Sequence, residues 1–255
     1  FQVPWMGVVT MAFAHYPHFF EVLWQRLKPL AQSEPFVEAC ASLRSRTETR
    51  VAALDPGRLV RRLETIGYAP REIDQMRASI EIFSHGNFPY LLTATAARRL
   101  LEGFELGSAT RALPYSGRHA PQTDVPFVLM EMHHADQDTR ALYEDIKATL
   151  GLPFVNTDYR ALARWPSYFA LAWRDLKPLV DGSEHAAICE EVHAYADELV
   201  GDLLPNPGAL TSDVLRNAAQ SDGKPDEILQ VTRLFQWLLP GLVTNVAFFR
   251  AQLID

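Results

Sequence analysis

Cysteine is scarce in this sequence, and what little there is shows no functional pattern. The 255 residues contain two cysteines, Cys40 and Cys189, which lie 149 positions apart and form no CxxC pair. A redox-active dithiol is therefore not expected. A position that needs a small apolar side chain explains both residues, since free cysteine is among the most buried residue types. We expect structural thiols in a reducing cytoplasm.

Long apolar runs and positive charge are also lacking. No uninterrupted apolar stretch reaches the roughly 18 residues that a membrane-spanning helix needs, and no signal peptide is evident. Lysine and arginine total 24 against 31 acidic residues, which gives a net charge of −7, and no basic stripe is present. Neither a membrane nor nucleic acid is therefore an expected partner. If the substrate is an acid, local hydrogen-bond donors must hold it.

The common catalytic and nucleotide-binding motifs are missing as well. The sequence has no GxGxxG, no GxxxxGK[ST], no GxSxG and no HExxH, which argues against the sites that those motifs build. His185, Cys189 and His193 are spaced by four residues along one predicted helix and look like half of a metal site. No CxxC or HExxH motif supports such a site, and Cys189 has a counterpart in Cys40, so we expect no metal.

What remains is helical periodicity. No stretch alternates apolar and polar residues for long enough to require a strand, so we predict an all-α fold. Tyr16-Pro17 should break the first helix and Lys28-Pro29 should close it, because proline lacks an amide donor. The turn-like run 84–87 should interrupt a later one. The predicted helices are 8–28, 35–53, 58–67, 70–83, 88–104, 138–150 and 183–201.

The sequence also contains an internal repeat, and repeats are a strong indication of architecture. Residues 3–30 align with residues 152–179 without a gap, at an offset of 149. Further on, an insertion of six residues near 204–208 shifts the offset to 155, where Pro225 matches Pro70 and Gly241 matches Gly86. The identical pairs in the first alignment are Pro4/Pro153, Ala12/Ala161, Ala14/Ala163, Pro17/Pro166, Phe20/Phe169, Trp24/Trp173 and the run 27–30/176–179.

From this repeat we predict a first helical repeat at 1–106, a linker at 107–130 and a second repeat at 131–255. The two repeats should pack as a pseudo-twofold dimer with the active site between them. The predicted helix 138–150 has no counterpart in the first repeat, so we expect a further helix before Phe1.

The two copies differ most at one polar triplet. The second repeat reads Asn156-Thr157-Asp158 where the first reads Gly7-Val8-Val9. Thr157 or Asp158 could simply cap the following helix, since both are good N-cap residues. However, the first copy starts the same helix without a polar cap. A carboxylate in apolar surroundings is also a better base, because desolvation raises its pKa. Asp158 is therefore the leading catalytic candidate.

Three other residues are candidates for a binding site. Asn87 and Tyr90 are spaced by three and would share one helix face, with both side chains available as donors. The alternative for Asn87 is turn chemistry in the run 84–87. Trp5 is matched by Phe154 in the second copy, so it is either a core residue or the wall of an apolar pocket.

These residues carry a family resemblance. The segments 3–5, 16–24, 86–90 and 156–166 resemble the group I 2-haloacid dehalogenases, the D- and DL-specific family, and the likeness covers essentially the whole chain. The resemblance implies an all-α enzyme without a cofactor, which removes halide from short 2-haloalkanoic acids and inverts the configuration. It also suggests a homodimer.

The resemblance also assigns roles. The family's catalytic aspartate falls on Asp158 with Asn87 as its partner, and the substrate-binding positions fall on Trp5, Tyr90, Asn156, Thr157 and Val8. Members that act on both enantiomers carry alanine at position 156, whereas asparagine is found in D-specific members. Where the family often has phenylalanine, this chain has Val8.

Other functions are still open at this point. The enzyme could act on both enantiomers, or the chain could be a non-catalytic helical module that binds carboxylates. Asp158 could activate a water molecule, or it could attack the substrate itself and form an ester. A helical alkylhydroperoxidase-like protein would need the CxxC pair that this chain lacks.

Overall fold

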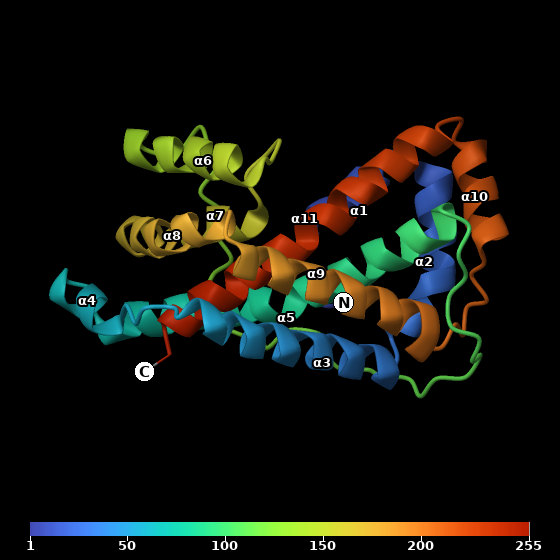
Figure 1. Cartoon of the computed structure of the whole chain (residues 1–255), viewed down its shortest axis with the longest axis horizontal. Helices are drawn as coiled ribbons and strands as arrows, with labels where there is room; N and C mark the ends of the chain where they lie inside the picture. The colour runs from blue at the N-terminus through green and yellow to red at the C-terminus, as the bar shows by residue number, and fades with distance from the viewer. Residues whose placement is uncertain (255) are drawn as a thin grey trace. The chain divides into compact units, whose positions relative to one another are not determined.

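The chain folds into α-helices joined by short turns and one long irregular segment. The computed structural model describes residues 1–254 (Figure 1). Within that range no β-strand is found, only an isolated bridge between Ser33 and Pro114. The predicted all-α class is therefore confirmed. The helices are α1 (Val8–Phe13), α2 (Pro17–Ala31), α3 (Glu34–Val51), η1 (Ala52–Leu54, 3-10), α4 (Val60–Thr65), α5 (Pro70–Leu101), α6 (Gln137–Leu150), α7 (Thr157–Leu162), α8 (Pro166–Val180), α9 (Ser183–Glu198), η2 (Leu199–Leu203, π), α10 (Ser212–Ser221) and α11 (Pro225–Gln252).

The helices are distributed over two compact units that do not follow chain order. The first unit consists of Phe1–Arg46, His85–Ala120 and Cys189–Val243. The second consists of Thr47–Ser84, Pro121–Ile188 and the chain from Thr244 on. Helices α3, α5, α9 and α11 each contribute residues to both units. The predicted division at 1–106, 107–130 and 131–255 describes a sequence relation, and it stays a prediction.

In the first unit, the chain breaks between α1 and α2 where the sequence predicts it. Pro17 is the first residue of α2, where its missing donor costs nothing. The next free amides of α2 are satisfied by Asp222 at the end of α10, whose carboxylate accepts from the Phe19 amide at 2.7 Å. Figure 1 shows α2 and α10 side by side. A carboxylate at a helix N-terminus also favours the helix dipole.

Two predicted helix ends are wrong. Helix α2 continues through Pro29 to Ala31, and α5 runs without a break through residues 84–87. Almost every residue of α5 from Ile82 to Ala97 is buried, and a buried backbone must satisfy its own polar groups. A continuous helix does this, so packing overrides the turn preference of Ser-His-Gly-Asn. Gly86 does not end the helix; it leaves room for the Trp5 ring.

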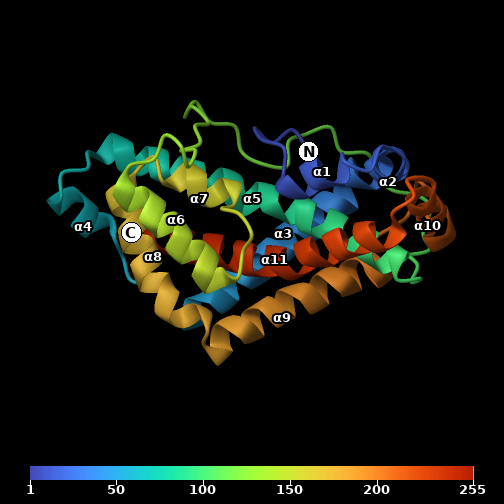
Figure 2. The ribbon, with the colours of Figure 1, turned by 90° about the horizontal axis from the view of Figure 1, so that it is seen from above.

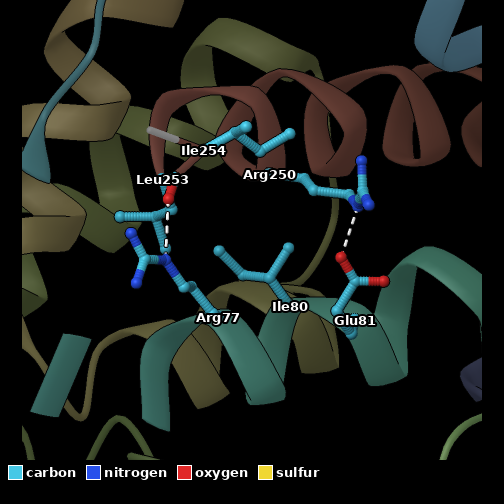
Figure 3. A pocket seen from close by; sticks show the side chains of 6 residues that line it. All are labelled: Arg77, Ile80, Glu81, Arg250, Leu253 and Ile254. Carbon is cyan, nitrogen blue, oxygen red and sulfur yellow. Dashed lines mark hydrogen bonds and ion pairs between the residues drawn. The ribbon is translucent and has the colours of Figure 1, made fainter. Parts of the chain in front are cut away.

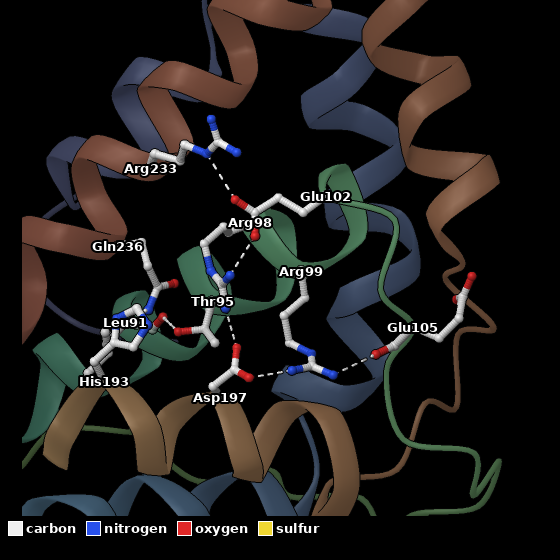
Figure 4. A network of polar contacts seen from close by, with 10 residues as sticks. All are labelled: Leu91, Thr95, Arg98, Arg99, Glu102, Glu105, His193, Asp197, Arg233 and Gln236. Carbon is white, nitrogen blue, oxygen red and sulfur yellow. Dashed lines mark hydrogen bonds and ion pairs between the residues drawn. The ribbon is translucent and has the colours of Figure 1, made fainter. Parts of the chain in front are cut away.

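A polar network fixes the end of α5 in the first unit (Figure 4). Asp197 of α9 accepts from both Arg98 and Arg99 of α5. Glu102 accepts from Arg98 at 2.6 Å and from Arg233 of α11 at 2.9 Å. The side chains of Arg98, Arg99 and Glu102 are mostly buried. Because each of these charges meets an opposite charge, the network joins three helices instead of leaving unpaired ions in the interior.

In the second unit, α6 and α7 both pack against α8, and Figure 2 shows α6 beside α8. Asp136 caps α6 by accepting from the Thr139 amide, and Gly151 ends it in the left-handed conformation. Asp145 of α6 then accepts from the Trp173 indole of α8 at 2.8 Å. These contacts support the short α7, which contacts α8 as well.

No helix in the described part of the chain is long and apolar enough to cross a membrane. Cys40 and Cys189 are not joined by a disulfide. Cys40 is buried, and burial raises the pKa of its thiol. Cys40 is therefore an inert structural thiol.

Candidate active site

The start of α7 places Asp158 in the protein interior. Asn156 occupies the N-cap position with φ −60° and ψ 155°, and its side chain makes no capping hydrogen bond. The alternative that Thr157 or Asp158 serves as the cap is therefore wrong. Asp158 is the second residue of the helix, and its side chain is only 2% exposed. A carboxylate in this position needs a reason other than capping.

Asn156 has an unsatisfied polar atom. The residue is 4% exposed, and its side-chain Oδ1 is buried without a hydrogen-bond partner among the described residues. Leaving such a group unpaired costs on the order of 1–3 kcal/mol. Buried polar groups are nearly always paired, so each exception requires an explanation. A ligand or water group beside Asn156 would complete the missing bond.

The rest of α7 is anchored from two sides. The Tyr159 ring packs against Phe169 of α8 and Phe249 of α11, and its hydroxyl accepts from Asn245 Nδ2 at 3.0 Å. Arg160 donates from Nη1 to both carboxylate oxygens of Glu131, at 2.7 and 2.9 Å. Sequence reasoning missed these anchors because their partners lie 29 and 86 positions away along the chain.

The first unit brings together another group of predicted residues. The Tyr90 hydroxyl donates to the Trp5 carbonyl at 2.9 Å, and the two rings lie 6.0 Å apart. Burial raises the pKa of Tyr90, so its phenol keeps its proton at neutral pH. A Cβ at Gly7 would lie 2.8 Å from the Tyr90 ring. A Cβ at Gly86 would lie 2.5 Å from the Trp5 ring. Both glycines are therefore required for close approach.

Asn87 and Val8 belong to the same part of the first unit. Asn87 follows Gly86 on α5, is buried, and precedes Tyr90 by three residues, so the two share a helix face. Since α5 is continuous there, the turn-chemistry alternative for Asn87 is wrong. Val8 is the first residue of α1 and is half-buried. The role of Trp5, as pocket wall or as core residue, stays a prediction.

With this geometry in place, comparison with known proteins identifies the family. The family described as "Halocarboxylic acid dehydrogenase DehI" matches residues 4–151, which is more than half of the chain. The chain belongs to the DehI family.

Curated relatives and solved structures of the same kind agree. An (R)-2-haloacid dehalogenase of Rhizobium sp. (strain NHG3) is 48% identical over 84% of this chain and 83% of its own length. An (R)-2-haloacid dehalogenase of Pseudomonas putida is 40% identical over 99% of this chain and 85% of its own. A solved complex of D-2-haloacid dehalogenase with L-LA matches with a TM-score of 0.89 and 38% identity, covering 99% of this chain and 88% of that one.

The histidines of this DehI-family chain do not gather into a metal site. His185 bonds with Asn245 Oδ1 at 2.8 Å, and His193 with Gln236 Nε2 at 3.1 Å. Among the described residues, no group of three His, Cys, Asp or Glu side chains is placed to hold a metal ion. The two imidazoles instead pair with amides of α11, each in its own unit.

A pocket of about 380 Å³ in the second unit has none of the predicted site residues in its lining (Figure 3). It is lined by Arg77, Ile80 and Glu81 of α5 and by Arg250, Leu253 and Ile254. Arg250 pairs with Glu81 at 2.5 Å, and Arg77 donates to the Leu253 carbonyl at 2.8 Å. Because both guanidinium groups already have partners, we assign no function to this pocket.

Proposed function

We propose that this DehI-family protein hydrolyses short D-2-haloalkanoic acids to L-2-hydroxy acids. In the reaction, a water oxygen forms a bond to C2 as the carbon–halogen bond breaks on the opposite side. Asp158 takes one proton from the water, and the halide leaves with the bonding electrons. Because attack occurs opposite the leaving group, the configuration at C2 inverts.

The observation that carries the proposal is that the second unit buries the carboxylate of Asp158 and, two residues before it in the sequence, an Asn156 amide with an unfilled hydrogen bond. A general base contributes about 10²–10⁴-fold to a reaction rate, and exclusion of water from its surroundings strengthens its interactions. The unpaired Oδ1 of Asn156 is an acceptor, so the group that fills its missing bond must be a donor such as a water molecule. The relatives named (R)-2-haloacid dehalogenase, at 40–48% identity, support the D-enantiomer as substrate.

The other predicted residues then have distinct roles. Asn87 holds the attacking water, and Tyr90, whose hydroxyl donates to the Trp5 carbonyl, lines the site. Thr157 holds the substrate carboxylate. Trp5 and Val8 contact the halogen and the alkyl end, and Asn156 hinders the L-enantiomer. No part of this assignment requires a metal or a cofactor.

The first test is halide release from D- and L-2-chloropropionate, followed by chiral analysis of the lactate. We expect L-lactate from the D-substrate and little turnover of the L-substrate. Equal rates on both enantiomers would instead support a DL-specific enzyme. Binding of either acid without halide release would support a carboxylate-binding module.

A second test separates the two chemical routes. In a single turnover in ¹⁸O-labelled water, direct attack places the label in lactate and leaves the protein unlabelled. An ester intermediate on Asp158 would place the label in the protein carboxylate. Mass spectrometry of the peptide that contains residue 158 distinguishes the outcomes.

We also propose a cytoplasmic location and a homodimer. The location rests on Cys40 and Cys189, which form no disulfide. The dimer rests on the family resemblance alone. Light scattering during gel filtration tests it, and a mass near the chain's own 28.7 kDa would contradict it.

A further inference from the structure

A buried chain of hydrogen bonds in the second unit ends at the residue that follows Asp158. His185 of α9 bonds to Asn245 of α11 at 2.8 Å, and Asn245 bonds to the Tyr159 hydroxyl at 3.0 Å. The three residues are 5%, 1% and 1% exposed. Nothing in the proposed reaction uses His185 or Asn245, so their burial is unexplained by the chemistry.

The direction of these bonds is fixed by the groups that take part. Asn245 donates from Nδ2 to Tyr159, so its Oδ1 must accept from His185. His185 therefore carries a hydrogen on Nε2. The Tyr159 oxygen acts as acceptor in this bond. Each member fixes the orientation of the next, and burial strengthens the chain.

Helix α7 depends on such external support. It has six residues, well below the roughly 12–15 that an isolated helix needs even for marginal stability. Its orientation is therefore set by what its side chains contact. Phe169 and Phe249 hold the Tyr159 ring by packing, but packing alone fixes rotation about the helix axis less strictly than a directional bond to the hydroxyl.

We propose that His185 and Asn245 are positioning residues that hold Tyr159, and through it the carboxylate of Asp158, in the orientation the reaction needs. The catalytic part of this inference rests on the proposed function of Asp158. A misplacement of about 1 Å at a reacting group can cost 10²-fold in rate. Loss of the hydrogen bonds from His185 and Asn245 should therefore lower kcat and leave KM nearly unchanged, since the proposed reaction gives neither residue a contact with the substrate.

A second histidine–amide pair in the protein serves as a control. His193 and Gln236 form this pair between the same two helices, α9 and α11, but in the first unit, and there the Gln236 amide donates to the imidazole (Figure 4). Removing the imidazole there takes away one comparable bond that does not lead to α7. His193→Leu therefore measures the general effect of such a loss on folding.

The experiment compares His185→Leu, His185→Gln and His193→Leu by kcat and KM on D-2-chloropropionate, corrected for the folded fraction by circular dichroism. We expect His185→Leu to lower kcat about 10- to 100-fold. His185→Gln should recover most of that loss, because its amide still donates to Asn245. His193→Leu should stay close to wild type. Equal kcat in His185→Leu and His193→Leu would overturn the proposal.

Amide hydrogen exchange of residues 157–162 provides a readout that does not depend on activity. Faster exchange in His185→Leu than in His193→Leu is expected, and unchanged protection would overturn the anchoring. Tyr159→Phe, which removes only the hydroxyl, repeats both measurements if His185→Leu fails to fold. Failure of the wild-type protein to release halide would count against the proposed function and against catalytic positioning, while the exchange result would still decide the anchoring.

Discussion

The start of α1 in the first unit and the start of α7 in the second have nearly the same backbone but opposite side-chain chemistry. Both helices have six residues, and both N-caps are extended, with φ and ψ of −59° and 142° at Gly7 and of −60° and 155° at Asn156. The following helices, α2 and α8, each have 15 residues and begin with a proline.

Against the start of α1 lies an aromatic ring. Tyr90 packs on Gly7 so closely that no side chain fits at residue 7. Asn245 is the counterpart of Tyr90 in the second copy, at the offset of 155. It packs no ring against α7 but takes part in a chain of hydrogen bonds. One copy is thus filled by rings and the other is held by polar bonds. The difference teaches that one backbone template supports either packing or a polar site, depending on which side chains surround it.

The largest expected effect comes from removing the charge at the start of α7. Asp158→Asn keeps the shape of the side chain but removes the base, so kcat should fall by about 10²–10⁴-fold. The melting temperature should change little, since the substitution adds no volume. Halide release and circular dichroism on the same sample check this. Substantial activity in a folded Asp158→Asn variant would end the assignment of the base.

The second-largest effect is expected from substitution of the N-cap residue of α7, Asn156. Asn156→Ala removes the side-chain volume and the amide group that should hinder the L-enantiomer. The residue then resembles its repeat counterpart, Gly7, which has no side chain. We expect the ratio of L- to D-2-chloropropionate turnover to rise by about tenfold or more, since an added steric or polar contact discriminates by about 1–3 kcal/mol. The rate on the D-substrate serves as the internal control. A variant that still rejects the L-substrate would contradict the selectivity argument.

A third prediction compares two glycines that match at the offset of 155. Gly86→Ala places a Cβ 2.5 Å from the Trp5 ring, whereas a Cβ at Gly241 meets nothing within 4 Å. Overpacking costs about 1–3 kcal/mol, whereas a helical glycine changed to alanine without strain gains about 0.5–1 kcal/mol. Gly86→Ala should therefore lower the free energy of unfolding, and Gly241→Ala should raise it slightly. Urea denaturation of both variants checks this, and equal effects would contradict the close approach of Trp5.

These examples show which features could be predicted from the sequence. The break at Tyr16-Pro17 follows from the chemistry of proline itself, and it is confirmed. The continuity of α5 through residues 84–87 could not be predicted, because it depends on burial by residues far away in the chain. Asp158 is a candidate because the internal repeat provides a comparison within one sequence, and its catalytic role stays a prediction.

The hydrogen-bond chain of Tyr159, Asn245 and His185 could not be predicted from the sequence for a related reason. Its members are separated by 86 and 60 positions, so only the fold brings them together. The spacing of His185, Cys189 and His193 is the only related signal in the sequence analysis, and it resembles half of a metal site rather than indicating a partner for Tyr159.

The smallest expected effect concerns the aromatic residues of the first unit and the dependence of stability on acid pH. His119 lies against the rings of Phe1, Phe36 and Tyr115, and its Nε2 is 3.0 Å from the Ala31 carbonyl. Burial lowers its pKa from 6.5 to about 4. Above pH 6.5 the imidazole is neutral in both the folded and the unfolded chain. As the pH falls from 6.5 to about 4, the unfolded chain binds a proton that the folded chain does not, so acid favours unfolding.

His119→Asn should remove this part of the acid sensitivity. Because the ring is partly exposed, we expect a difference of only about 1 kcal/mol between wild type and variant over this range. Urea denaturation at pH 7 and at pH 4.5 measures it: the loss of stability between the two values should be smaller in His119→Asn. An equal loss would mean that the imidazole is as easily protonated in the folded protein as in water, and that the rings of Phe1, Phe36 and Tyr115 do not shield it.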